Sequence, residues 1–175
     1  MLLICASVQQ VLAQAEIDWR PLVPEGTKHE LIYFPLPVEV RLDTLQTATG
    51  EVSVTTYYAA DPKGRSGNRL YQLMTYAVPP GSFPADSVER IDAFFEATAE
   101  EAVLAVGGEL KFMDATERAY PGRVFRIDFG ERGVVSRNYV YLVGDAYYHL
   151  QVLSAREDDG SKSRTRFFDG FSPRT

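Results

Sequence analysis

Hydrophobic and polar residues alternate most regularly between residues 120 and 154. Apolar and charged side chains take turns in the run Phe125, Arg126, Ile127, Asp128 and Phe129. A period of two is typical of a strand with one buried face. Glycine-containing turns at 130–133 and 144–145 separate this run from two further alternating segments. The pattern therefore predicts three consecutive antiparallel strands joined by tight turns.

The second of these turns, at 144–145, predicts the register of the last two strands. A two-residue turn places Val143 opposite Ala146 and Tyr141 opposite Tyr148. One face should meet a helix, because it carries the more apolar set Tyr139, Tyr141, Val143, Tyr148, Leu150 and Val152. The other face is mixed and is expected to be partly covered or partly wet, with Asn138, Val140, Leu142, Tyr147, His149 and Gln151.

A long amphipathic helix is expected after residue 86, because apolar residues recur there at helical spacing. Its apolar stripe comprises Val88, Ile91, Phe95, Thr98, Ala102 and Val106. Asp86 as the N-cap, with Glu89 three residues later, resembles a capping box. The pair Gly107-Gly108 supplies the left-handed residue that ends many helices.

Further elements complete the expected fold. Strands are expected at 31–34, 51–59, 68–78 and 110–116, and a terminal helix at 161–171 that packs Phe167, Phe168 and Phe171 on the sheet. Irregular segments are expected at 17–24, where Trp19 covers one end of the core, at 38–48 on the surface, and in a mobile loop at 60–68. The expected class is α+β: an antiparallel sheet of about six or seven strands, flanked by the long helix and the C-terminal helix.

The first 15 residues resemble an export signal, which leaves 16–175 as a single domain. A short apolar run precedes Ala13-Gln14-Ala15, an A-x-A cleavage pattern, although no basic region comes before it. The alternative is a buried or frayed N-terminal helix. No later stretch has the roughly 20 apolar residues of a membrane helix. We therefore expect a periplasmic or extracellular protein, and the mass of the mature N-terminus would test this.

Charge and composition exclude several classes of function. The net charge of -6 argues against nucleic-acid binding through phosphate contacts. The single cysteine, Cys5, cannot form an internal disulfide, and with two histidines it offers little for a transition-metal site. Gly64 and Gly67 lack the following Lys-Ser/Thr of a phosphate-binding loop. We expect no cofactor.

Two groups of titratable residues are candidates for acid–base chemistry. His149 titrates near neutral pH, as a general base or ligand should, but the pattern offers it no partner, which favours a structural role. Asp114, Glu117 and Asp128 could form a carboxylate cluster across strands, although nearby arginines favour ordinary ion pairs. The acidic run 157–160 lacks the spacing of a calcium loop and is expected to be a solvated turn.

Tyrosines are frequent on the expected strands: Tyr57, Tyr58, Tyr71, Tyr76, Tyr139, Tyr141, Tyr147 and Tyr148. On a sheet face left bare by the helices they would form an amphipathic binding patch. The alternative is that most belong to the core. The candidate partner-binding residues are Tyr147, His149 and Gln151 on the sheet, with Lys63 and Arg65 in the 60–68 loop.

Four short motifs mark corners of the expected fold: Phe34-Pro35-Leu36-Pro37, Tyr120-Pro121-Gly122-Arg123, the hairpin 141–148, and Phe167-Phe168-Asp169-Gly170-Phe171. Together they resemble bacterial members of the PsbP-like group, which share a fold with the Ran-binding Mog proteins. The resemblance covers most of residues 17–172. It implies an antiparallel sheet with helices on both faces, and a role in binding other proteins or as an extrinsic or chaperone-like module. It assigns no functional residue to this chain.

Two functions remain open from the sequence. The first is a non-enzymatic exported module that binds another protein of the cell envelope through the sheet and the 60–68 loop. The second is a small-ligand carrier or hydrolase with a pocket between the sheet and the long helix near His149. A concave site lined by His149 and a carboxylate would favour the second function, whereas a flat, exposed His149 would exclude it.

Overall fold

The computed structural model describes residues 17–24, 31–35, 37–47, 50–61, 64–84, 87–130 and 133–173. The expected signal segment, His29, Lys63 and Asp86 lie outside these ranges. Neither helix in the described part of the chain is both long enough and apolar enough to cross a membrane.

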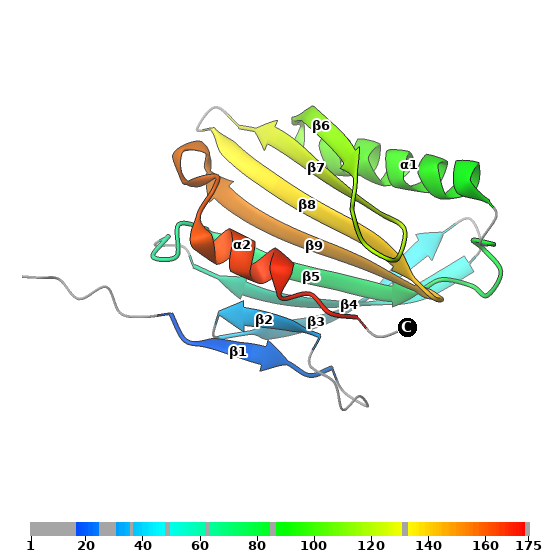
Figure 1. The fold of residues 1–175 in the computed structure, drawn as a ribbon, viewed down its shortest axis with the longest axis horizontal. Helices are drawn as coiled ribbons and strands as arrows, with labels where there is room; N and C mark the ends of the chain where they lie inside the picture. Colours follow the sequence, from blue (N-terminus) through cyan, green and yellow to red (C-terminus); the bar gives the residue numbers. More distant parts are fainter. Residues whose placement is uncertain are drawn as a thin grey trace, which may run out of the picture.

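The fold is α+β, built on a seven-stranded antiparallel sheet (Figure 1). From edge to edge the strands are β3 (Glu39–Thr47), β4 (Gly50–Ala60), β5 (Leu70–Ala77), β9 (Ala146–Ala155), β8 (Val134–Val143), β7 (Gly122–Phe129) and β6 (Glu109–Ala115). A separate two-stranded sheet pairs β1 (Trp19–Leu22) with β2 (Ile32–Pro35). The helices are α1 (Val88–Val106) and α2 (Lys162–Asp169), and a single 3-10 turn (Arg156–Asp158) follows β9.

The predicted register of the β8–β9 hairpin is confirmed. Val143 lies opposite Ala146, and Tyr141 lies opposite Tyr148. Gly144 in the turn has a φ of 57°, a left-handed value that glycine adopts without steric cost. Because side chains alternate along a strand, this register decides which residues lie on each face.

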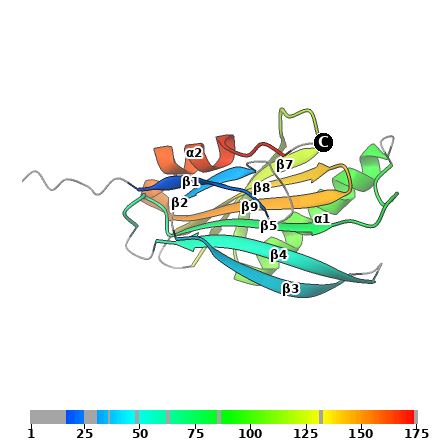
Figure 2. The same ribbon diagram turned by 90° about the horizontal axis from the view of Figure 1, so that it is seen from below.

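The two faces of the sheet have different covers (Figures 1 and 2). On one face, the more apolar face of the hairpin meets α2 and the β1–β2 pair, and Phe167, Phe168 and Phe171 pack there as expected. Tyr139 stacks on Phe168 with the ring centroids 4.2 Å apart, and Tyr141 stacks on Phe171 at 5.2 Å. On the other face, α1 packs Phe95 against a second apolar cluster.

Residues 38–48 do not wrap the surface as expected, because most of them form the edge strand β3. β3 pairs with β4 over nine residues without a register shift. Apolar and charged residues of this strand alternate only from Glu39 to Asp43, and Val40, Leu42 and Leu45 are all exposed, so the usual sign of a buried face is absent. Segment 17–24 likewise contains a strand, β1, whose half-buried Trp19 packs edge-on against Tyr71.

The start of α1 also differs from the expectation. The helix begins at Val88 with Ser87 as its N-cap, and the Ser87 side chain makes no capping hydrogen bond. Val88 is 63% exposed, so the buried stripe is shorter than predicted and consists of Ile91, Phe95 and Ala99. The predicted end is confirmed, because Gly107 adopts a φ of 60° and its N–H bonds back into the last turn.

Candidate functional site

Helix α1 covers only part of its face of the sheet. It lies over β6 and β7, its apolar side chains also pack against β8 and β9, and it leaves the same face of β3, β4 and β5 without a helix (Figures 1 and 2). A helix is about 10–12 Å wide, whereas neighbouring strands are about 4.8 Å apart, so one helix spans roughly two strands. The uncovered half of this face holds two adjoining cavities, which share Leu45 and Met74. We call the two together the trough.

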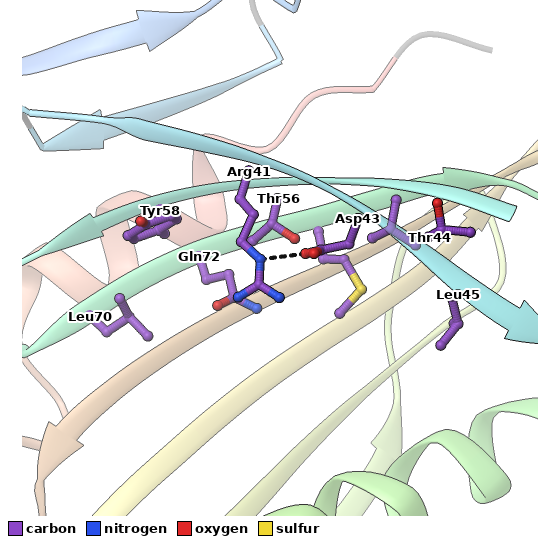
Figure 3. Close-up of a pocket in the computed structure, with 10 residues that line it drawn as sticks. Arg41, Asp43, Thr44, Leu45, Thr56, Tyr58, Leu70 and Gln72 are labelled. Carbon is purple, nitrogen blue, oxygen red and sulfur yellow. Dashed lines mark ion pairs between the residues drawn. The ribbon is translucent and has the colours of Figure 1, made fainter.

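The outer cavity of the trough lies over the edge strands and has a volume of about 760 Å³. Its lining, drawn in Figure 3, comprises Arg41, Asp43, Thr44, Leu45, Val54, Thr56, Tyr58, Leu70, Gln72 and Met74. Arg41 and Asp43 point toward each other, and Arg41 Nε lies 2.6 Å from Asp43 Oδ2 (Figure 3). The outer cavity is therefore a broad depression with mixed polarity.

The inner cavity lies between α1 and the strands and has a volume of about 540 Å³. Its lining comprises Leu45, Gln46, Met74, Tyr76, Phe94, Thr98, Glu101, Ala102, Ala105, Tyr147 and His149. Tyr147 is the central ring, because it lies 4.8 Å from the Tyr76 ring and 5.5 Å, edge-on, from the Phe94 ring. The inner cavity thus combines aromatic walls with an imidazole and one carboxylate.

A buried hydrogen-bond network fixes the imidazole of His149. The ring Nε2 lies 3.0 Å from Asn138 Oδ1. The Asn138 amide is oriented by its own partners, because Nδ2 donates to the Ser136 carbonyl oxygen and Gln151 Nε2 donates to Oδ1. A carbonyl oxygen can only accept, so Asn138 must present Oδ1 to the ring. His149 therefore carries its proton on Nε2, which makes Nδ1 the acceptor nitrogen of the ring.

Burial also keeps His149 uncharged. The side chain has 7% exposure, and desolvation lowers the pKa of His149 to about 4. Burial, together with the nearby carboxylate of Glu101, raises the pKa of Tyr76 to about 12, so its hydroxyl stays protonated. At neutral pH the inner cavity therefore offers a neutral imidazole acceptor, a protonated phenol and the Glu101 carboxylate at an exposed position.

The lining of the inner cavity has no evident nucleophile paired with His149. Thr98 is its single serine- or threonine-type hydroxyl, and Thr98 Oγ1 donates to the Phe94 carbonyl oxygen at 2.8 Å. A hydrolase would need a nucleophile within hydrogen-bond reach of the base. The base would also need a pKa near neutral, so that it can take up the proton of the nucleophile. Among the described residues no group of three or more His, Cys, Asp or Glu side chains could hold a metal ion. His149 is therefore paired with the Asn138 amide and not with a nucleophile of the lining.

The predicted partner-binding residues do not form one surface. Tyr147 and His149 are buried against α1, and Gln151 is half-buried in the Asn138 network. Arg65 is exposed in the β4–β5 loop, where its Nε lies 3.7 Å from Asp61 Oδ1, and it lines a separate small cavity. In the same loop Asn68 is fully buried, and its Nδ2 donates to Ser161 Oγ at 2.8 Å.

Asp114 and Asp128, two members of the candidate carboxylate cluster, do not meet on the described strands. Asp114 lies opposite Val124, whereas Asp128 lies opposite Glu109, several residues away along the same strand pair. The alternative favoured by the sequence, ordinary ion pairs with nearby arginines, describes Asp128. Asp128 is held by Arg126, with Nε and Oδ1 2.5 Å apart, and by Arg156 at 3.0 Å.

The acidic run 157–160 is not a simple solvated turn, because the Asp159 side chain is only 4% exposed. Arg137 and Arg126 bind it at 2.7 and 2.9 Å, and Arg164 pairs with it as well. Burial alone would raise the pKa of Asp159, but the hydrogen bonds and charges of these arginines lower it. A signal was available in the sequence: Arg126 and Arg137 face each other across β7 and β8, and like charges directly opposite need an anion between them.

Most of the tyrosines belong to the core or to its edge. Tyr71, Tyr141 and Tyr147 are buried, and Tyr139 and Tyr148 pack against the α2-side core. The exceptions that bear on function are Tyr58 and Tyr76, which line the outer and the inner cavity. Sequence reasoning named the region near His149 but missed Phe94, Glu101 and Met74, whose convergence depends on the path of α1.

Comparisons with known proteins find a weak structural similarity and no family. No family model matches the chain, and a search of curated proteins finds no match. Among solved structures, the chain is similar to PA94 from Pseudomonas aeruginosa, a protein of unknown function. The two are 10% identical with a TM-score of 0.46, over 77% of this chain and 98% of that one.

Proposed function

We propose that this protein is a non-enzymatic binding module that holds a small amphipathic molecule in the inner cavity of the trough. The observation that carries the proposal is the combination of aromatic walls with a neutral His149 whose Nδ1 is left as an acceptor. A volume of about 540 Å³ is ordinary for a small-molecule site, since such sites are mostly apolar cavities of roughly 300–1,000 Å³ with a few placed polar groups.

The lining defines the chemistry of the ligand. Tyr76, Phe94 and Tyr147 favour a flat aromatic or other apolar body, which they would contact edge-on and face-on. His149 Nδ1 can only accept a hydrogen bond, so the ligand should carry an N–H or O–H donor. Glu101 disfavours an anion, as does the net charge of -6. A neutral or cationic aromatic amine meets all three conditions.

The same geometry weighs against the two alternatives. A protein partner bound flat on the sheet through Tyr147 and His149 would need those side chains exposed, but they are 3% and 7% exposed. A hydrolase would need a nucleophile beside His149, and the Thr98 hydroxyl is already committed to the helix backbone. The ligand-carrier form of the second sequence-based hypothesis is therefore the one the cavity supports.

A fluorescence titration with N-phenylnaphthylamine tests the proposal. This probe is an apolar secondary amine with one N–H donor, and its emission rises in apolar surroundings. Ala105→Trp places an indole at an exposed helix position that lines the inner cavity. We expect it to weaken probe binding by about tenfold or more, because the indole occupies the site.

Leu104→Trp is the matched control. It adds the same indole to the next position of α1, where Leu104 is 79% exposed and does not line the cavity. We expect wild-type affinity from this variant. Equal affinity of wild type and Ala105→Trp, or no saturable binding to the wild type, would exclude the inner cavity as the site.

A further inference from the structure

Strand β3 is an open sheet edge that has no bulge, proline or lysine. Its inner edge pairs with β4 in unbroken register, and no described strand pairs with its outer edge. Val40, Leu42 and Leu45 are 58%, 77% and 47% exposed along this one strand. An unpaired edge presents backbone donors and acceptors to any matching strand, and exposed apolar residues add to that tendency.

The opposite edge strand, β6, is protected against pairing with another strand. Its register against β7 shifts between Leu110 and Phe112, which places Lys111 in an irregular position. A bulge and a lysine are two devices by which proteins prevent strands from adding to a sheet edge. β3 has no register shift, and its charged residues alternate in sign: Glu39, Arg41 and Asp43.

The sequence of β3 is complementary to itself in one antiparallel register. In an antiparallel pair, residues directly opposite each other have their side chains on the same face of the sheet. A two-fold axis perpendicular to the sheet satisfies this only when it lies at a residue that is opposite its own copy. With Leu42 on the axis, Arg41 faces Asp43 of the copy and Asp43 faces Arg41, while residues 39–45 overlap. With Arg41 or Asp43 on the axis, the same charge would face itself, which is destabilising.

Other centres are poorer. With Val40 on the axis only residues 39–41 of the strand overlap, and with Thr44 on the axis neither Arg41 nor Asp43 meets an opposite charge. The Leu42-centred register also brings the most exposed apolar residue of the strand against its own copy. It exchanges the ion pair within each strand, between Arg41 and Asp43, for two pairs between strands.

We propose that β3 is a homodimer interface, in which two copies of this chain pair antiparallel about Leu42 and continue one sheet across both molecules. The axis keeps both copies of α1 on the same side of the joined sheet. Because Arg41, Asp43 and Leu45 line the outer cavity, the two troughs would adjoin at the axis. The proposal does not rest on the proposed ligand.

Sedimentation velocity on the whole protein, from about 1 μM to several hundred μM, tests the interface. Strand pairing alone buries less than a standard interface of about 1,600 Å², so we expect a dimer with micromolar affinity. Arg41→Asp and Asp43→Arg each place like charges opposite each other twice, and each should weaken dimerisation by about tenfold or more. The double variant restores opposite charges and should restore the dimer.

Leu42→Lys supplies a second test that does not depend on the charge pairs. It places two ammonium groups together at the axis and should leave a monomer at every concentration. Circular dichroism melts on each variant establish whether a lost dimer is a lost fold. Arg41 and Leu42 are exposed and the Asp43 side chain is 40% exposed, so we expect each variant to fold. A wild type that stays monomeric, or single charge variants that dimerise like the wild type, would overturn the proposal.

Discussion

Burial decides the charge of His149, and the stability of the protein should depend on pH as a result. The pKa of His149 is about 4 in the folded chain and 6.5 when unperturbed. Above pH 6.5 neither the folded nor the unfolded chain protonates His149, so burying the neutral imidazole does not change how stability depends on pH. As the pH falls from 6.5 toward 4, only the unfolded chain takes up the proton, so stability falls. The loss should approach about 3 kcal/mol, at 1.36 kcal/mol per pKa unit.

Denaturant unfolding of wild type and His149→Gln between pH 7 and pH 4.5 measures this effect. Glutamine does not titrate, and its amide can still donate to Asn138 Oδ1, so the variant should lose less stability on acidification. The lowered pKa values of Asp128 and Asp159 act in a different window, because those carboxylates lose their contribution only below about pH 3.8. If the free energy of unfolding falls equally with pH in wild type and His149→Gln, then burial does not hold His149 in its neutral form.

At the scale of elements, Asp159 joins segments that are distant in sequence. Its carboxylate follows the 3-10 turn and pairs with Arg126 on β7, Arg137 on β8 and Arg164 on α2. These arginines are about one-fifth exposed, so they are partly removed from water. The contact therefore fixes the C-terminal helix to the sheet by charge as well as by the three phenylalanines.

Asp159→Asn keeps the volume of the side chain and removes the charge. Arg137 and Arg164 would then lose this anion, and Arg126 would keep only Asp128. We expect the free energy of unfolding to fall by about 3 kcal/mol, as when one partner of a buried ion pair is removed. Asp158→Asn is the matched control at an exposed neighbouring position, and it should change stability by less than about 0.5 kcal/mol. Equal unfolding midpoints for the two variants would show that the cluster does not stabilise the fold.

Elements could be predicted where local chemistry specifies them. The Gly144 turn and the period of two predicted the β8–β9 hairpin and the residues on each of its faces. The glycines after Val106 predicted the end of α1. β3 was missed because its apolar residues lie at an open edge, where alternation does not mark burial. Asp159 was missed because its partners come from β7, β8 and α2, and their meeting depends on tertiary structure.

At the scale of the whole molecule, one helix on a wide sheet produces the candidate site. α1 lies over β6 and β7 and packs its apolar side chains against β8 and β9 as well, and the face of β3, β4 and β5 stays open as the trough. The sequence pattern gave the mixed face on which His149 lies, but not where α1 would cross it. The side of the trough near α1 is therefore aromatic, and the side near β3 has mixed polarity.

The nitrogen NMR spectrum of the imidazole side chains, recorded during titration with N-phenylnaphthylamine, tests the binding site most directly. The chain has only two histidines, so a His149→Gln spectrum assigns the signals. Before the titration, His149 should appear as a neutral ring with its proton on Nε2. Saturating probe should shift the Nδ1 signal of His149 in wild type and in Leu104→Trp, but not in Ala105→Trp. A protein that binds the probe while both nitrogen signals of His149 stay unchanged would contradict the account.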